Sequence, residues 1–280
     1  MTRRALLSLA VPAALFAAVT VSLPSRSDAL RFAVIGDTGT GTQRQYDLAQ
    51  RMVEAREQFP FSFVIMLGDN MYHGERPADF EKKFQRPYRT LLDAGVTFHA
   101  VLGNHDNSSQ VNYGPFNMGG QRYYTFSPRP DVEFFALDSN YMDPAQIRWL
   151  ETSLQKSKAR WKICFMHHPL YSSGEKHGSD VALRQVIEPL FVKYGVSLAL
   201  AGHEHFYERI KPQKDIPYFI SGAGGQLREG NIRSRSELEA KGFDDDLSFM
   251  LMQISGDKLD FECIARDGST VDKGEITARK

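Results

Sequence analysis

The stretch Phe61–Tyr72, FSFVIMLGDNMY, is the part of the sequence that decides the fold. A nearly unbroken apolar run ends at Gly68, and Asp69 follows directly. A short apolar run that stops at a glycine is typical of a strand buried on both faces, as in the parallel sheet of an α/β protein. Open α/β sheets bind ligands at the carboxyl ends of their strands, so we expect Asp69 and Tyr72 at an active-site edge.

The segments around this strand predict a parallel sheet. Residues 30–35 form a predicted strand that ends in Gly36-Asp37, and residues 42–57 carry apolar side chains at helical spacing. Strand, helix and strand make a βαβ unit, whose two strands should be parallel neighbours with a right-handed crossover. Residues 77–94 are expected to be mainly helical, and a third strand at 96–102 leads into Asn104 and His105.

The rest of the chain predicts a second group of strands. Residues 121–126 and 132–137 look like an antiparallel pair, and Asp143 is a predicted cap for a helix that begins at Pro144. Further strands are expected at 161–166, 196–201, 218–220, 249–254, 259–264 and 270–276, with helices at 144–156 and 179–194 and a long polar loop at 222–246. This order predicts two stacked sheets with helices outside them, in one domain over residues 30–280.

The first 29 residues have the pattern of a signal peptide. Thr2-Arg3-Arg4 is a positive start, residues 5–23 are apolar, and Ser27-Asp28-Ala29 resembles a cleavage site. Arg3-Arg4 also resembles a twin-arginine signal. We predict export to the periplasm or the medium, with no membrane attachment after cleavage. The alternative is an uncleaved anchor, because 19 apolar residues could span a bilayer.

The overall charge and the cysteines restrict the possible partners. Lys plus Arg and Asp plus Glu number 34 each, so the net charge is zero. A neutral chain is not expected to bind nucleic acid or an acidic membrane through bulk charge. Cys164 and Cys263 lie in separate predicted strands, and we expect two buried free thiols rather than a disulfide, which needs a specific Cα separation.

Five predicted strand ends carry side chains of the metal-ligand type. They are Asp37, Asp69 with Tyr72, Asn104 with His105, His167, and His203 with His205. Oxygen and nitrogen donors without thiolate suit hard or borderline ions such as Fe, Mn or Zn. Residues two apart in an extended chain project to the same side, so His203 and His205 suit one ion each of a close pair, with Asp69 as the bridging carboxylate.

In this order the motifs resemble the five-block signature of the calcineurin-like metallophosphoesterases. The blocks are Asp37-x-Gly39, Gly68-Asp69-x-x-Tyr72, Gly103-Asn104-His105-Asp106, His167, and Gly202-His203-x-His205. Tyr72 is similar to the tyrosine of the purple acid phosphatases of the small, single-domain kind. The resemblance covers residues 30 to about 225, and it implies an α/β fold, an α/β/β/α sandwich of two mixed sheets flanked by helices.

The resemblance also implies a set of ligands for two metal ions. Fe(III) would be held by Asp37, Asp69, Tyr72 and His205, and a second ion (Fe, Zn or Mn) by Asp69, Asn104, His167 and His203. The fourth block departs from the family's Val-x-x-His, because Cys164 stands at its first position. His168 therefore stays open as an alternative ligand, and an ordinary packing role stays open for Tyr72.

The activity that the resemblance implies is hydrolysis of small phosphate monoesters at acidic pH. A metal-bound hydroxide would attack phosphorus, and His105, oriented by Asp106, would donate a proton or a hydrogen bond to the leaving group with His177 assisting. Two alternatives remain. One is a divalent-metal phosphodiesterase or nucleotidase of the same superfamily, and the other is a catalytically idle protein that binds phosphate or a partner.

Overall fold

Two β-sheets lie face to face in a computed structural model that describes residues 18–233 and 236–279. The first sheet has the strand order β13-β12-β11-β1-β2-β3. Its parallel part consists of β1 (Leu30–Ile35), β2 (Phe63–Met66) and β3 (Thr97–Ala100). The strands β11 (Ser248–Ser255), β12 (Lys258–Ala265) and β13 (Thr270–Thr277) extend it in antiparallel fashion from β1. The predicted parallel pairing of the first two strands is confirmed, and β2 lies between β1 and β3.

The second sheet has the order β10-β8-β9-β7-β6-β5-β4. Its strands are β4 (Tyr124–Arg129), β5 (Val132–Ala136), β6 (Trp161–Phe165), β7 (Leu198–Ala201), β8 (Tyr207–Gln213), β9 (Ile216–Ser221) and β10 (Glu239–Phe243). Strands β5, β6, β7 and β9 are parallel, and the predicted antiparallel pairing of β4 with β5 is confirmed.

One prediction for this sheet is wrong, because β10 lies inside the stretch 222–246 that the sequence predicts to be loop. The strand is a five-residue edge strand, Glu-Ala-Lys-Gly-Phe, whose pairing with β8 is interrupted by a register shift. A partly exposed strand of this composition has no alternation of apolar and polar residues, so its pattern cannot be told from that of a loop.

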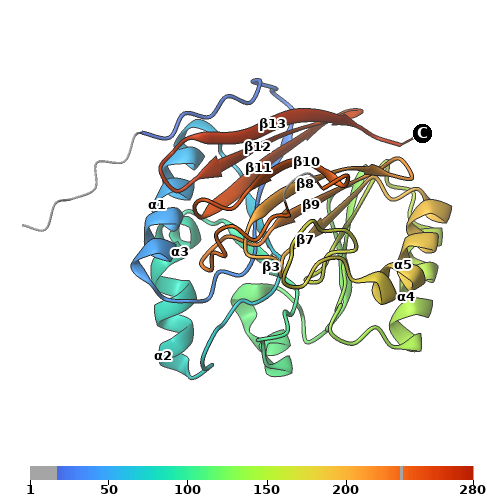
Figure 1. Ribbon diagram of the computed structural model, residues 1–280, viewed down its shortest axis with the longest axis horizontal. Coiled ribbons are helices and arrows are strands. Elements are labelled where there is room, and N and C mark those ends of the chain that lie inside the picture. Colours follow the sequence, from blue (N-terminus) through green and yellow to red (C-terminus); the bar gives the residue numbers. More distant parts are fainter. Residues whose placement is uncertain (1–17, 234–235, 280) are drawn as a thin grey trace, which may run out of the picture.

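Helices cover the outer face of each sheet (Figure 1). They are α1 (Gln43–Gln58), α2 (Pro77–Phe80) and α3 (Arg86–Asp93) on the first sheet, and α4 (Pro144–Lys156) and α5 (Val181–Tyr194) on the second. The Asp143 side chain accepts a hydrogen bond from Gln146 N, as expected of a helix cap.

The helix predicted at 77–94 is interrupted by a π-helical turn, η1 (Glu81–Gln85). Pro87 has no N–H to donate to the carbonyl of Lys83, so an unbroken α-helical pattern is impossible there. The Gln45 side chain donates to that carbonyl instead, at 2.6 Å. Two short 3-10 turns, Ser108–Asn112 and Gly114–Phe116, lie between β3 and β4.

Three hydrophobic clusters hold these layers together. The cluster between the sheets is aromatic and includes Phe32, Phe63, Phe134, Phe165 and Phe219. Each outer cluster joins a sheet to its helices. Cys164 and Cys263 are both buried and free, as predicted. His99 also packs in the core, with its ring centroid stacked 3.9 Å from that of Phe126. These observations confirm the two-sheet sandwich flanked by helices.

Residues 18–29 run along the first sheet beside β11 and β12 (Figure 1). Ser22 donates two hydrogen bonds of 2.8 Å to the Glu262 carboxylate, and Arg26 forms an ion pair of 2.7 Å with Asp260. Both carboxylates are nearly inaccessible, at 0% and 4% exposure. The segment therefore supplies hydrogen-bond partners to two buried acids.

The predicted signal peptide lies mostly outside the described residues, since residues 1–17 are not described. Among the residues that are, no helix has the length and apolar character needed to cross a membrane. Cleavage after Ala29 stays a prediction, and such cleavage would remove the segment 18–29 from the folded domain.

Removal of residues 1–29 is expected to destabilise the domain more than removal of residues 1–17. Asp260 would keep only its hydrogen bond from Gln253, and Glu262 only its hydrogen bond from Thr270. Loss of the other partners should lower the melting temperature by roughly 5–15 °C, because buried polar groups with too few hydrogen bonds are costly. Calorimetry of the two truncated chains measures the difference. The substitution Glu262→Gln should recover part of the loss in the shorter chain only. Equal melting temperatures for the two chains would show that the segment contributes nothing to stability.

Candidate metal centre

The five predicted ligand-bearing strand ends meet at one edge of the sandwich. Asp37, Asp69 and Asn104 follow the parallel strands β1, β2 and β3 of the first sheet. His167 and His203 follow β6 and β7 of the second sheet. Because the carboxyl ends of parallel strands lie together, each sheet delivers its donors to the same place.

The backbone at three of these positions adopts a conformation that side chains rarely accept. Asp37, Asp69 and His203 have φ values of +56°, +49° and +70°. Strained residues of this kind persist only where the surrounding structure holds them, and they cluster at functional sites. Glycine allows the turns to approach each other: a Cβ on Gly103 would lie 2.1 Å from the Asp69 carboxylate. The close packing of the turns thus fixes the position of the carboxylates.

One group of donors surrounds the hydroxyl of Tyr72. Its Oη atom lies 2.7 Å from Asp69 Oδ2 and 3.2 Å from Asp37 Oδ1. The Nε2 atom of His205 is 3.3 Å from the same hydroxyl. Three carboxylate and phenol side chains with one imidazole therefore point to a common centre. The structure brings together all four residues that the resemblance assigned to Fe(III).

A second group of donors surrounds the imidazole of His167. His167 Nδ1 is 2.8 Å from the carbonyl of Leu67, which can only accept, so Nδ1 carries the proton and Nε2 is a free lone pair. That Nε2 atom lies 3.0 Å from Asn104 Oδ1, 3.1 Å from His203 Nδ1 and 3.5 Å from Asp69 Oδ1. The residues assigned to the second ion are thus also together, with Asp69 shared between the groups.

The electrostatics of the two groups fit bound cations. Asp37 and Asp69 are 0% and 1% exposed, and burial, followed by the nearby charge of Asp69, raises the pKa of Asp37 well above its usual range. Burial lowers the pKa of His203 to about 2 and that of His205 to about 4, so both rings are neutral lone-pair donors. Buried acids beside neutral imidazoles are stabilised by metal ions, and the oxygen and nitrogen donors suit iron, zinc or manganese.

His168, the alternative ligand, lies beside the second group. Its Nδ1 atom is 2.9 Å from Ser139 Oγ, and its ring centroid lies 4.4 Å from that of His203. Ligand atoms of His167, His168 and His203 all fall within 4.8 Å of one another. His168 differs from His167 because Ser139 can donate or accept, so its partner does not fix the proton on Nδ1.

The two histidines expected to face the substrate lie at the mouth of the site. His105 is exposed, with its ring centroid 4.9 Å from that of Tyr72. His177 is exposed as well, and its ring centroid is 4.3 Å from that of His203. The structure therefore brings both rings next to the predicted ligands.

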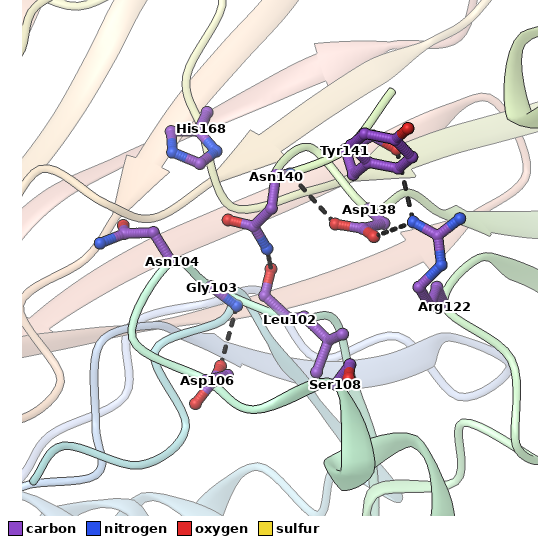
Figure 2. Close-up of a pocket in the computed structure, with 10 residues that line it drawn as sticks. All are labelled: Leu102, Gly103, Asn104, Asp106, Ser108, Arg122, Asp138, Asn140, Tyr141 and His168. Atoms are coloured by element: carbon purple, nitrogen blue, oxygen red, sulfur yellow. Dashed lines mark hydrogen bonds and ion pairs between the residues drawn. The ribbon is translucent and has the colours of Figure 1, made fainter. Parts of the chain in front are cut away.

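Asp106 has different contacts from those expected. Its carboxylate accepts hydrogen bonds from the backbone N–H groups of Asn70, Met71 and Gly103, at 2.8–3.0 Å, and burial raises its pKa to about 7. Figure 2 shows the Asp106 side chain turned toward Gly103. These bonds tie the turn after β2 to the turn after β3, whereas the predicted role was to orient the His105 ring.

Sequence reasoning missed two charged residues that support the site. Lys83 donates to the carbonyls of Tyr72 and Gly74, which holds the turn that carries the Tyr72 ring. Glu204 is fully buried between the two histidines of the last block and accepts a 2.6 Å hydrogen bond from Gly178 N, next to His177. No pattern in the sequence marks either residue, because each acts through contacts that the folded loops create.

The fold and the donor set define a phosphoesterase class, and comparison with known proteins places the chain within it. The family model described as calcineurin-like phosphoesterase matches residues 30–207. The chain belongs to this family. It is 30% identical to purple acid phosphatase 17 of Arabidopsis thaliana over 247 residues, 75% of this chain and 72% of that protein. It is 24% identical to human tartrate-resistant acid phosphatase type 5 over 309 residues, 92% of this chain and 95% of that protein.

Solved structures confirm the fold. A purple acid phosphatase from yellow lupin seeds superposes with a TM-score of 0.74 at 18% identity, over 91% of this chain and 55% of that one. GAP50, described as the anchor in the inner membrane complex of Plasmodium, gives a TM-score of 0.77 at 21% identity, over 90% of each chain. The family and its named relatives bear out the predicted resemblance and define the enzyme class as metal-dependent phosphatase.

The substitution His167→Ala should remove one metal ion, whereas His168→Ala should leave both. The reason is that the Leu67 carbonyl fixes the tautomer of His167 alone, so only this ring must present a bare nitrogen. Metal content per chain, measured by mass spectrometry on purified protein, should fall from two to about one for His167→Ala. Near-ultraviolet circular dichroism checks that both variants fold. Loss of an ion in His168→Ala with retention in His167→Ala would assign the ligand to His168.

Proposed function

We propose that the protein hydrolyses phosphate monoesters at acidic pH with a pair of metal ions. The observation that carries this proposal is the meeting of Asp37, Asp69 and His205 around the hydroxyl of Tyr72, within 3.3 Å of it. A phenol in that position is suited to bind Fe(III) as a tyrosinate. The purple acid phosphatases among the relatives support the same assignment.

The proposed ligands divide between two ions. Fe(III) would be held by Asp37, Asp69, Tyr72 and His205. The second ion, Fe, Zn or Mn, would be held by Asp69, Asn104, His167 and His203. When bound, the ions supply positive charge for the phosphate oxygens and make water more acidic. The carboxylate of Asp69 belongs to both groups because its Oδ2 faces Tyr72 and its Oδ1 faces His167.

The chain's own contribution to the reaction comes from the histidines at the mouth. His105 and His177 are exposed beside the two donor groups, where they can hydrogen-bond the phosphate. A protonated ring nitrogen of His105 would donate its proton to the leaving oxygen as the ester bond breaks. Because only the protonated imidazole can act in this way, we propose activity on the acidic side of neutrality. Glu204 positions His177 through the neighbouring Gly178 N–H.

We also propose that the protein works outside the cytoplasm, in the periplasm or as a secreted enzyme. The support is the arginine-led apolar segment at the start of the chain, whose first 17 residues lie outside those that the structure describes. Cys164 and Cys263 are buried free thiols, so no disulfide between them ties the protein to one redox compartment.

The substrate class can be tested with the metal-loaded protein on p-nitrophenyl phosphate and bis(p-nitrophenyl) phosphate. The monoester should react with a kcat/KM at least about tenfold above that of the diester, because a site built for a phosphate dianion loses contacts to a diester. A faster diester would favour the phosphodiesterase alternative. No hydrolysis of either compound would favour a binding protein on this fold, such as the anchor among its structural neighbours.

The substitution His105→Asn should slow hydrolysis of an alkyl phosphate by roughly 10²–10⁴ in kcat. The effect on p-nitrophenyl phosphate should be much smaller, because p-nitrophenolate leaves without protonation. His73→Asn is a matched control, since His73 is also exposed and its φ of +57° suits asparagine. Equal losses on both substrates would show that His105 binds phosphate without donating a proton.

A further inference from the structure

A cavity of about 700 Å³ opens beside the proposed second metal site (Figure 2). Asn104 and His168 form its inner wall, next to the predicted ligands. Arg122 and Tyr141 form its outer wall, and they come from segments before β4 and after β5. A phosphate held at the metal centre would therefore have this cavity beside it for the organic part of its ester.

The single cation in the outer wall is already neutralised. Arg122 forms ion pairs with Asp138 through NH1 and with Asp143 through NH2, at 2.5 and 2.9 Å. Both terminal nitrogens of the guanidinium already hold carboxylates. A substrate anion that bound Arg122 through two hydrogen bonds would therefore compete with these ion pairs. Asp138 lines the cavity, and Asp143 lies behind Arg122 as its second ion-pair partner. Two acids around one arginine give this side of the cavity an excess negative charge, which opposes a second anionic group on the substrate.

The outer wall also presents an exposed aromatic ring. Tyr141 is 66% exposed, and it is the only aromatic among the large hydrophobic side chains that are exposed in the described part of the chain. The Arg122 guanidinium lies 5.5 Å from its ring centroid. The loop that carries the ring is held by two side chains: Asn140 Nδ2 donates to Leu102 O at 3.1 Å, and Gln146 Nε2 donates to the carbonyl of Tyr141 at 3.2 Å. The ring is thus held at the cavity without being buried.

We propose that this cavity binds the leaving group, and that it selects phosphate esters of uncharged aromatic alcohols over esters that carry a further negative charge. The aromatic group stacks on Tyr141, while Asp138 and Asp143 repel an anionic group. The proposal rests on the proposed phosphatase function, and it names the substrate class of the same site.

Binding of non-hydrolysable phosphonates tests the proposal separately from catalysis. Calorimetry on the metal-loaded protein should give phenylphosphonate an affinity about tenfold above that of methylphosphonate. Tyr141→Phe should keep this ratio because it keeps the ring, and Tyr141→Ala should reduce it to within about threefold. A ratio that Tyr141→Ala leaves unchanged would overturn the proposal. If the ratio behaves as expected but phenyl phosphate is not hydrolysed, the cavity assignment stands and the phosphatase function falls.

A second variant tests the selection against ligands that carry a further negative charge. Asp143→Asn frees one arm of Arg122 and keeps the helix cap, because asparagine caps helices as well as aspartate does. We expect the ratio of the affinity for 3-phosphonopropionate to that for methylphosphonate to be about tenfold higher in Asp143→Asn than in the unchanged protein. An unchanged ratio would show that the acids of the outer wall do not select against negative charge.

Discussion

The burial of two neighbouring carboxylates is the constraint on which the rest of the structure depends. Asp37 and Asp69 are almost inaccessible and both lie within 3.2 Å of one phenol oxygen. Their ion-pair partners are His205 and His167, whose pKa values are lowered, so the rings are neutral and cannot balance the charge. A cation-binding site is the arrangement in which such a cluster becomes favourable. This cluster of buried carboxylates and imidazoles is held in place by the strained turns, by the hydrogen bond that fixes the tautomer of His167, and by the packing of the two sheets.

The sandwich explains how one chain assembles donors from distant positions. Each sheet contributes parallel strands, and their ends meet where the aromatic cluster between the sheets stops. Hydrogen bonds then join the sheets directly: Asp37 accepts from His203 N at 2.9 Å, and Leu67 O accepts from His167. The proposed metal ligands on opposite sheets are therefore positioned by backbone contacts as well as by packing.

Much of the fold and site could be predicted because the signals were local. The strand at Leu30–Ile35 and the helix at Pro144–Lys156 begin and end where the apolar patterns and the Asp143 cap predict. Asp37, Asp69, Asn104, His167 and His203 each follow a glycine or an apolar run, which marks them as strand ends. Pro87 marks a break in the helix, but the π-helical form of that break could not be predicted because the Lys83 carbonyl is bound by Gln45. The edge strand β10 and the contacts of Asp106 likewise depend on partners that only the folded chain supplies. The same holds for Tyr141, whose exposure beside Arg122 is a product of loop packing.

The central claim is that Tyr72 binds Fe(III), and the most direct test is the visible absorption spectrum of the purified protein together with its iron content. The account predicts bound iron and a purple tyrosinate-to-iron absorption band that disappears in Tyr72→Phe, while the variant keeps its fold because the ring still packs. Two divalent ions with no visible band in either protein would contradict the claim. They would leave the phosphoesterase fold in place and assign Tyr72 an ordinary packing role.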